Sequence, residues 1–207
     1  MGADLGFRKS KRRQCAKKML ILVEGASEET YFRYFRGRSP DFKIIPVEVK
    51  RSGLDQILEE CQYRIKDYKI EGVNDRVVAI FDADCFTADE IESSANKASK
   101  QGIELYVSNP SFEYWLILHF KDYNKYASSK DMEGELSMLL GKEYVKSEGI
   151  SSTLTDQKIN NAIVRASKAI PFGNADPLFC KEHLPSTTVH SLVREILDII
   201  QKNKRPQ

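Results

Sequence analysis

Short apolar runs alternate with amphipathic segments between residues 19 and 120, and this alternation limits the folds that the chain can adopt. Four apolar runs have the length and composition of strands that are covered on both faces. They span residues 19–23, 42–49, 76–81 and 103–107. Four further segments have helical periodicity, and they span residues 27–36, 54–68, 87–100 and 112–120. This order of elements predicts an α/β fold in which a mostly parallel sheet is flanked by helices.

The remainder of the chain has helical patterns only. They predict helices over residues 131–140, 156–170 and 187–201. We therefore expect a flexible basic arm over residues 1–18 and an α/β core over residues 19–125. We expect residues 126–207 to form a helical C-terminal extension that packs on the core through apolar helix faces.

Composition places the chain among globular proteins of modest charge. It has 207 residues, of which 41% are hydrophobic and 30% are charged, and its net charge is +2. The four cysteines are far apart in the sequence and form no Cys-x-x-Cys pair, which argues against a structural zinc site. No apolar stretch approaches the roughly 20 residues that a membrane-spanning helix needs. We expect a cytoplasmic protein with reduced thiols and no membrane association.

Acidic residues follow two of the predicted strands. Glu24 comes directly after the first strand, and Asp82 and Asp84 end the third. Because sites in open parallel sheets form at the carboxyl ends of strands, we expect these three carboxylates to converge. Each motif alone is usually a turn or a solvated loop, but the two together favour a metal site. Carboxylate oxygens are ligands that suit Mg²⁺ or Mn²⁺.

Three stretches of the sequence carry a resemblance to a known family. The first stretch is Val23-Glu24-Gly25 with Glu28, Tyr31 and Phe32. The second is the most distinctive and runs from Ser108 to Trp115, with His119 and Phe120. The third runs from Pro185 to His190, with Leu192 and Val193. Together they resemble the RloB-like family. Residues 22–28 with residues 81–84 are also similar to the Toprim signature, which topoisomerases, primases and the overcoming-lysogenization-defect (OLD) nucleases share.

The resemblance implies a Toprim-like (Rossmann-like) fold and metal-dependent cleavage of DNA or RNA. It also implies a role in phage defence, often beside an AAA/ABC-type ATPase that is encoded nearby. By the same resemblance, Asp82 and Asp84 hold the metal, and Glu24 binds it or moves a proton. The OLD-type pattern adds Glu28 and Glu113 as further ligands, which is enough for two ions. Both residues also fit the first turn of a helix, where the helix dipole favours Glu, so this simpler interpretation stays open.

Three other residues have expected roles outside the metal site or beside it. His119 lies on an apolar helix, so a hydrogen-bonded core histidine is favoured over a catalytic one. Lys181 lies in a polar loop and is a candidate for stabilising charge on a phosphate, although no motif marks it. Ser27 is the expected cap of the first helix.

Two rival functions stay open. The first is a non-cleaving Toprim protein that binds nucleic acid or acts as a scaffold subunit of an ATPase complex. The second is a haloacid-dehalogenase-like phosphohydrolase, which also has an Asp-x-Asp motif after a buried strand. That motif normally lies on the first strand, whereas Asp82 and Asp84 follow the third. The sequence leaves open the choice of DNA or RNA and the oligomeric state.

The basic arm generates a prediction about substrate binding. Its cationic residues are Arg8, Lys9, Lys11, Arg12, Arg13, Lys17 and Lys18. If they contact phosphates, deleting residues 1–16 weakens nucleic-acid binding and makes it less dependent on salt concentration, because fewer counterions are released. The fold should survive, because the arm has no apolar stripe. Titrations at several salt concentrations measure both quantities, and an unchanged affinity and slope would make the arm a solubilising tail.

Overall fold

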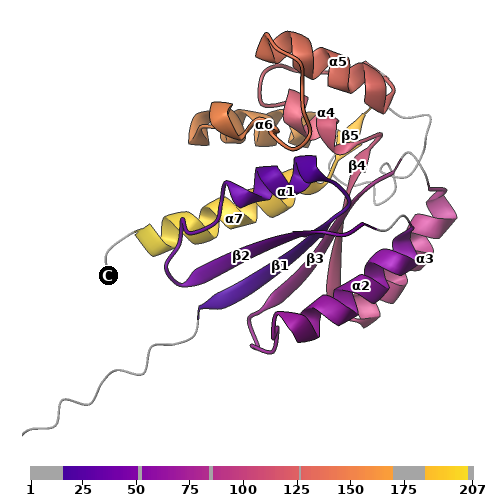
Figure 1. Ribbon diagram of the computed structural model, residues 1–207, viewed down its shortest axis with the longest axis vertical. Coiled ribbons are helices and arrows are strands. Elements are labelled where there is room, and N and C mark those ends of the chain that lie inside the picture. The colour runs from indigo at the N-terminus through magenta and orange to yellow at the C-terminus, as the bar shows by residue number, and fades with distance from the viewer. Residues whose placement is uncertain (1–15, 51–52, 84–85, 126, 170–184, 205–207) are drawn as a thin grey trace, which may run out of the picture.

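The computed structural model describes residues 16–50, 53–83, 86–125, 127–169 and 185–204. A five-stranded sheet in the order β2-β1-β3-β4-β5 forms its centre (Figure 1). The first four strands are parallel to one another, and the short fifth strand is antiparallel to β4. The strands are β1 (Lys17–Val23), β2 (Phe42–Glu48), β3 (Arg76–Asp82), β4 (Ile103–Asn109) and β5 (Ser186–Thr187).

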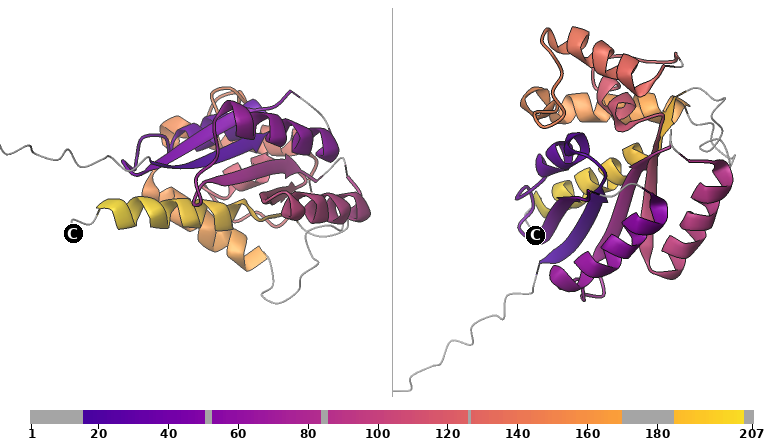
Figure 2. Two further views of the ribbon diagram at one scale, coloured as in Figure 1. Left: turned by 90° about the horizontal axis from the view of Figure 1, so that it is seen from below. Right: turned by 45° about the vertical axis from the view of Figure 1, so that its right-hand side comes forward.

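Helices cover both faces of the sheet, which explains the apolar runs in the middle of β1 and β3. On one face lie α2 (Leu54–Asp67) and α3 (Ala88–Lys100), whereas α1 (Ala26–Arg33) and α7 (Val189–Lys204) lie on the other (Figures 1 and 2). Beyond the carboxyl ends of the strands lie α4 (Phe112–Ile117), α5 (Ser129–Leu140) and α6 (Asp156–Ala169). A short 3₁₀ turn, η1 (Ser151–Thr153), precedes α6.

The core is divided by the sheet into two clusters. Side chains of β1 alternate between them, as expected for a strand: Met19 and Ile21 join one cluster, and Leu20 and Leu22 join the other. The cluster with Met19 also contains the buried faces of α1 and of α4 to α7. The C-terminal helices therefore share one core with the strands. Among the described helices, none is long and apolar enough to cross a membrane.

The predicted α/β fold, with a mostly parallel sheet flanked by helices and a helical C-terminal part, is confirmed. The boundary of the basic arm needs a correction, because Lys17 and Lys18 belong to β1. The backbone N–H of Lys18 donates to Asp75 Oδ1 (2.8 Å), and its ammonium group donates to the carbonyl oxygens of Tyr68 (3.1 Å) and Lys69 (2.7 Å). Because these bonds satisfy the polar groups of Lys18, a charged residue can lie near the start of a strand that is mostly buried.

The expected start of the last helix at residue 187 was also wrong. Ser186 and Thr187 form β5, which pairs with the end of β4, and α7 begins at Val189. The hydroxyl groups of Thr187 and Ser108 lie 2.9 Å apart, and Thr188 Oγ1 accepts a hydrogen bond from the N–H of Val107 (2.8 Å). A strand of two polar residues has no hydrophobic alternation, so pattern reasoning cannot find it.

His119 is a core residue, as predicted, and it ties α4 to α1. Its side chain is only 2% exposed. The carbonyl oxygen of Trp115 lies 2.9 Å from Nδ1, so Nδ1 carries the proton and donates. Nε2 therefore accepts from the hydroxyl of Tyr31, at 3.1 Å. Burial lowers the pKa of His119 to about 4.

This environment predicts that His119 stays neutral well below the usual histidine range. Because its folded pKa lies below the ordinary value of 6.5, its contribution to stability is lost as the pH falls from 6.5 through about 4. Nitrogen chemical shifts of the imidazole should report the Nδ1–H tautomer from pH 8 to pH 5. Titration of the His119 signal near pH 6.5 would contradict the assignment.

Candidate functional site

Two of the predicted site residues meet at the carboxyl ends of adjacent strands. Glu24 follows β1 directly, and Asp82 is the last residue of β3. The backbone N–H of Asp82 donates to Glu24 Oε2 at 3.0 Å, which holds the Glu24 carboxylate against the end of β3. Parallel pairing of β1 with β3 brings the two residues together. Asp84, the third residue of the predicted set, lies outside the described residues.

Glu28 lies in the first turn of α1 and is only 4% exposed. Its carboxylate lies over Gly25, because a Cβ atom on Gly25 would be 3.1 Å from Glu28 Oε2. Burial, together with the nearby charges of Glu113 and Glu24, raises the pKa of Glu28 to about 7. Glu28 therefore titrates close to neutral pH.

Glu113 lies in the first turn of α4 and is 2% exposed. Ser27 Oγ donates a hydrogen bond to its Oε1 at 3.0 Å, and the hydroxyl of Tyr144 donates to the same oxygen at 3.3 Å. The expected capping role of Ser27 was wrong: α1 has Gly25 as its N-cap residue and no side-chain cap. Ser27 instead holds the Glu113 carboxylate, and its Oγ lies 2.7 Å from the hydroxyl of Tyr144.

Tyr144 and Lys146 were not predicted as site residues. They belong to the segment between α5 and η1, far from β1 in the sequence. Lys146 Nζ lies 2.9 Å from Glu133 Oε1 and 3.7 Å from Glu113 Oε1. Partial burial lowers the pKa of Lys146, but the ion pairs with these carboxylates outweigh this effect and raise it overall. The segment has neither periodicity nor a motif that could have marked either residue. Lys181, the lysine that the sequence suggested, is outside the described part of the chain.

We call Glu24, Glu28, Asp82 and Glu113 the acidic cluster. Its members are close enough for their charges to interact. The charges of Glu24 and Glu113 raise the pKa of Glu28, and those of Glu113 and Asp82 raise the pKa of Lys146. Such a group of like charges costs free energy unless protons or cations neutralise it.

The residues of the acidic cluster fit a divalent metal by their chemistry, because all of their side-chain donors are carboxylate oxygens. Hard oxygen donors suit Mg²⁺ and Mn²⁺ better than soft metals. In the described residues there is no group of three or more His, Cys, Asp or Glu side chains that could hold a metal ion. The ligand set Glu24, Glu28, Asp82, Asp84 and Glu113 therefore stays a prediction.

Residues 19–196 match the family model described as RloB-like protein. The chain belongs to the RloB-like family. In this RloB-like chain the matched region begins in β1 and ends in α7, so it contains the acidic cluster together with Tyr144 and Lys146. A comparison with curated proteins finds no match.

The raised pKa of Glu28 generates a prediction about stability. The folded state binds the proton more tightly than the unfolded chain, whose ordinary Glu pKa is 4.5. The stability that comes from protonated Glu28 is therefore complete below pH 4.5 and is lost as the pH rises through about 7. In metal-free buffer, Glu28→Gln should stabilise the protein at pH 8 by up to about 3 kcal/mol and change little at pH 4.

Denaturant unfolding at both pH values measures this difference. Glu29→Gln is the matched control, because Glu29 lies on the same helix and is paired with Arg33 at 2.7 Å near the surface. It should change stability by less than about 1 kcal/mol at either pH. An equal loss of stability at pH 4 and pH 8 in Glu28→Gln would show that ionisation of Glu28 does not destabilise the folded protein.

Proposed function

We propose that this RloB-like chain is a nuclease that hydrolyses phosphodiester bonds of DNA or RNA with Mg²⁺ or Mn²⁺. The observation that carries the proposal is the hydrogen bond between Asp82 and Glu24, around which the acidic cluster gathers at the carboxyl edge of a parallel sheet. In sheets of this kind the carboxyl edge is where ligands bind. The carboxylate oxygens of the acidic cluster suit Mg²⁺, which binds to carboxylates and substrate phosphates in enzymes that act on phosphate groups.

The resemblance to Toprim and OLD-type nucleases supports the same function. It assigns the acid after the first strand to Glu24 and the pair after the third strand to Asp82 and Asp84. It also makes Glu28 and Glu113 candidate metal ligands. Both side chains are buried, and the charges of Glu24 and Glu113 affect the pKa of Glu28. A role in phage defence together with an AAA/ABC-type ATPase is the cellular part of this proposal.

Each residue of the cluster has a task in the proposed reaction. Glu24, Glu28, Asp82, Asp84 and Glu113 would hold one or two ions, which supply positive charge and a water of lowered pKa when bound. The N–H of Asp82 orients the Glu24 carboxylate. Glu28 titrates near neutral pH and can hold or release a proton. Lys146 brings a positive charge to the edge of the cluster, where a phosphate would be attracted.

The proposal predicts opposite effects of one substitution on activity and stability. Asp82→Asn keeps the backbone N–H that binds Glu24 but removes one negative charge from the cluster. Stability should hold or rise, because the carboxylates repel one another less. Cleavage should fall by at least about a hundredfold, because the metal is held less well. Binding of nucleic acid should largely persist if Lys and Arg provide it.

The assay uses plasmid, single-stranded DNA and transfer RNA, each with Mg²⁺, Mn²⁺ or EDTA, and a melting curve of the same sample. Asp198→Asn is the control, because Asp198 is exposed on α7 and does not belong to the acidic cluster. Cleavage by Asp82→Asn at the rate of the unchanged protein would defeat the site assignment. If the unchanged protein cleaves none of these substrates, the scaffold function is the better account, or the ATPase is required.

A further inference from the structure

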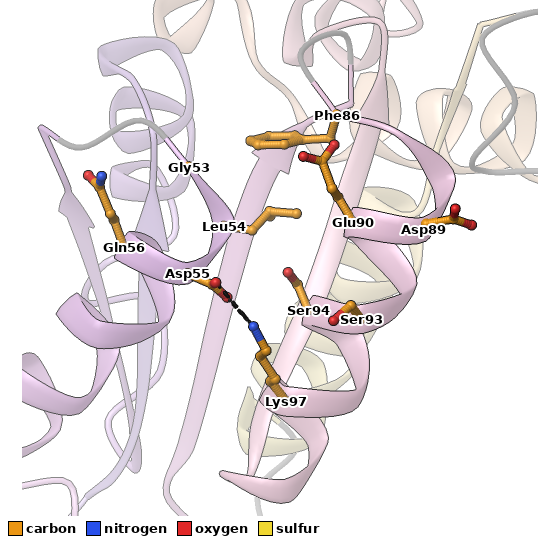
Figure 3. A pocket seen from close by; sticks show the side chains of 10 residues that line it. All are labelled: Gly53, Leu54, Asp55, Gln56, Phe86, Asp89, Glu90, Ser93, Ser94 and Lys97. Atoms are coloured by element: carbon orange, nitrogen blue, oxygen red, sulfur yellow. Dashed lines mark hydrogen bonds and ion pairs between the residues drawn. The ribbon is translucent and has the colours of Figure 1, made fainter.

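A pocket of about 440 Å³ lies between the N-terminal ends of α2 and α3 (Figure 3). This volume is in the range of about 300–1,000 Å³ that is typical of small-molecule sites. The ring of Phe86 covers one end of the pocket, and the Lys97 ammonium group, 2.8 Å from Asp55 Oδ1, closes the other. Leu54 lies between them on the apolar side.

The lining suits a flat heterocycle better than an aliphatic ligand. Phe86 is half-buried and packs edge-on against Phe81, with ring centroids 6.0 Å apart, which fixes its ring as a stacking surface. Polar side chains that can donate and accept hydrogen bonds also line the pocket, namely Gln56, Ser93 and Ser94. Sites that bind a nucleobase commonly combine an aromatic ring that stacks on the base with groups that form hydrogen bonds to its edge.

The charges of the pocket exclude a phosphate from it. Asp55, Asp89 and Glu90 line the pocket, and Lys97, the one lysine among the described lining residues, is already paired with Asp55. A phosphate inside would meet these carboxylates at close range and be repelled. A neutral base meets no such penalty, so the sugar-phosphate chain must stay outside while the base enters.

The pocket also lies next to the acidic cluster. The backbone N–H of Phe86 donates to the carbonyl oxygen of Ala83 at 3.2 Å, and Ala83 directly follows Asp82. Ala83 is itself held at the strand end by a hydrogen bond from its N–H to the carbonyl oxygen of Ser108 (2.8 Å). The aromatic end of the pocket is therefore anchored beside the end of β3, the strand that carries Asp82 of the acidic cluster.

We propose that this pocket binds one unpaired nucleobase of a nucleic-acid strand whose phosphate chain passes the acidic cluster. This inference rests on the proposed function, and it makes single-stranded or locally opened nucleic acid the preferred substrate. A base that is stacked in a duplex cannot enter the pocket without being extruded, and extrusion costs free energy. Phe86 stacks on the base, and the polar lining contacts its edge.

The test is a binding titration with Ca²⁺ in place of Mg²⁺ or Mn²⁺, so that a divalent cation offsets the charge of the acidic cluster without either of the proposed catalytic metals. The probes are single-stranded oligothymidylate and oligouridylate that each carry one 2-aminopurine, whose fluorescence falls when the base stacks. We expect quenching with the unchanged protein and none with the same probe in a duplex. Phe86→Ala should abolish the quenching and weaken binding by about tenfold, as the loss of one base–aromatic stack does.

Three further variants separate the pocket from general effects on the fold. Ser93→Trp fills the pocket from an exposed helix position, so it should abolish quenching even if Phe86→Ala is unstable. Tyr63→Ala removes an exposed aromatic ring of α2, and Asn96→Trp adds one on α3 outside the pocket. Both should bind and quench like the unchanged protein.

The outcomes distinguish the pocket from the proposed function. Loss of quenching in Phe86→Ala and Ser93→Trp supports the pocket, even if the unchanged protein cleaves nothing with either metal. Cleavage by the unchanged protein, with equal quenching in all variants, overturns the pocket and leaves the nuclease proposal standing. Absence of quenching with every probe also overturns the pocket.

Discussion

Repulsion among carboxylates at one edge of the sheet is the constraint around which the described structure is organised. Parallel pairing of β1 and β3 puts Glu24 and Asp82 side by side, and the turns that follow β1 and β4 bury Glu28 and Glu113 nearby. The chain offsets this repulsion in three ways. It donates N–H and O–H groups to the carboxylates, places the ammonium group of Lys146 beside them, and keeps a proton on Glu28 near neutral pH. A divalent cation would act against the same repulsion, so the binding of the proposed metal would be coupled to stability at this edge.

The aromatic core beneath this edge supplies the rigidity that such a cluster needs. Tyr31 makes edge-on contacts with Phe32, Phe112 and Trp115, and its hydroxyl binds His119. These contacts join α1, which carries Glu28, to α4, which carries Glu113. Because close-packed aromatic rings leave little freedom of movement, the relative position of the two glutamates is held by residues that touch neither carboxylate.

The sequence predicted those features that leave a local pattern. Each buried strand is an apolar run, and a charge at its end is conspicuous, so Glu24 and Asp82 could be found without a structure. His119 was recognisable as a core residue because its neighbours on the helix are apolar. Ser27 was misassigned because capping preferences describe a residue's own turn, whereas its partner Glu113 is 86 positions away. Tyr144 also contacts Ser27, 117 positions away, and no local pattern of their own segment marks Tyr144 or Lys146.

The long span of these contacts has a consequence for the order in which the protein is made. Ser27 and Tyr144 are 117 positions apart. During synthesis, β1, β3 and their acidic residues therefore emerge from the ribosome well before Tyr144 and Lys146, which contact the acidic cluster. Until Tyr144 and Lys146 emerge, the carboxylates of this edge have the N–H of Asp82 and the hydroxyl of Ser27 as hydrogen-bond donors but lack the hydroxyl of Tyr144 and the ammonium group of Lys146. The site is therefore completed late, and a chain interrupted before this segment has the proposed metal ligands without the hydroxyl of Tyr144 and the ammonium group of Lys146 beside them.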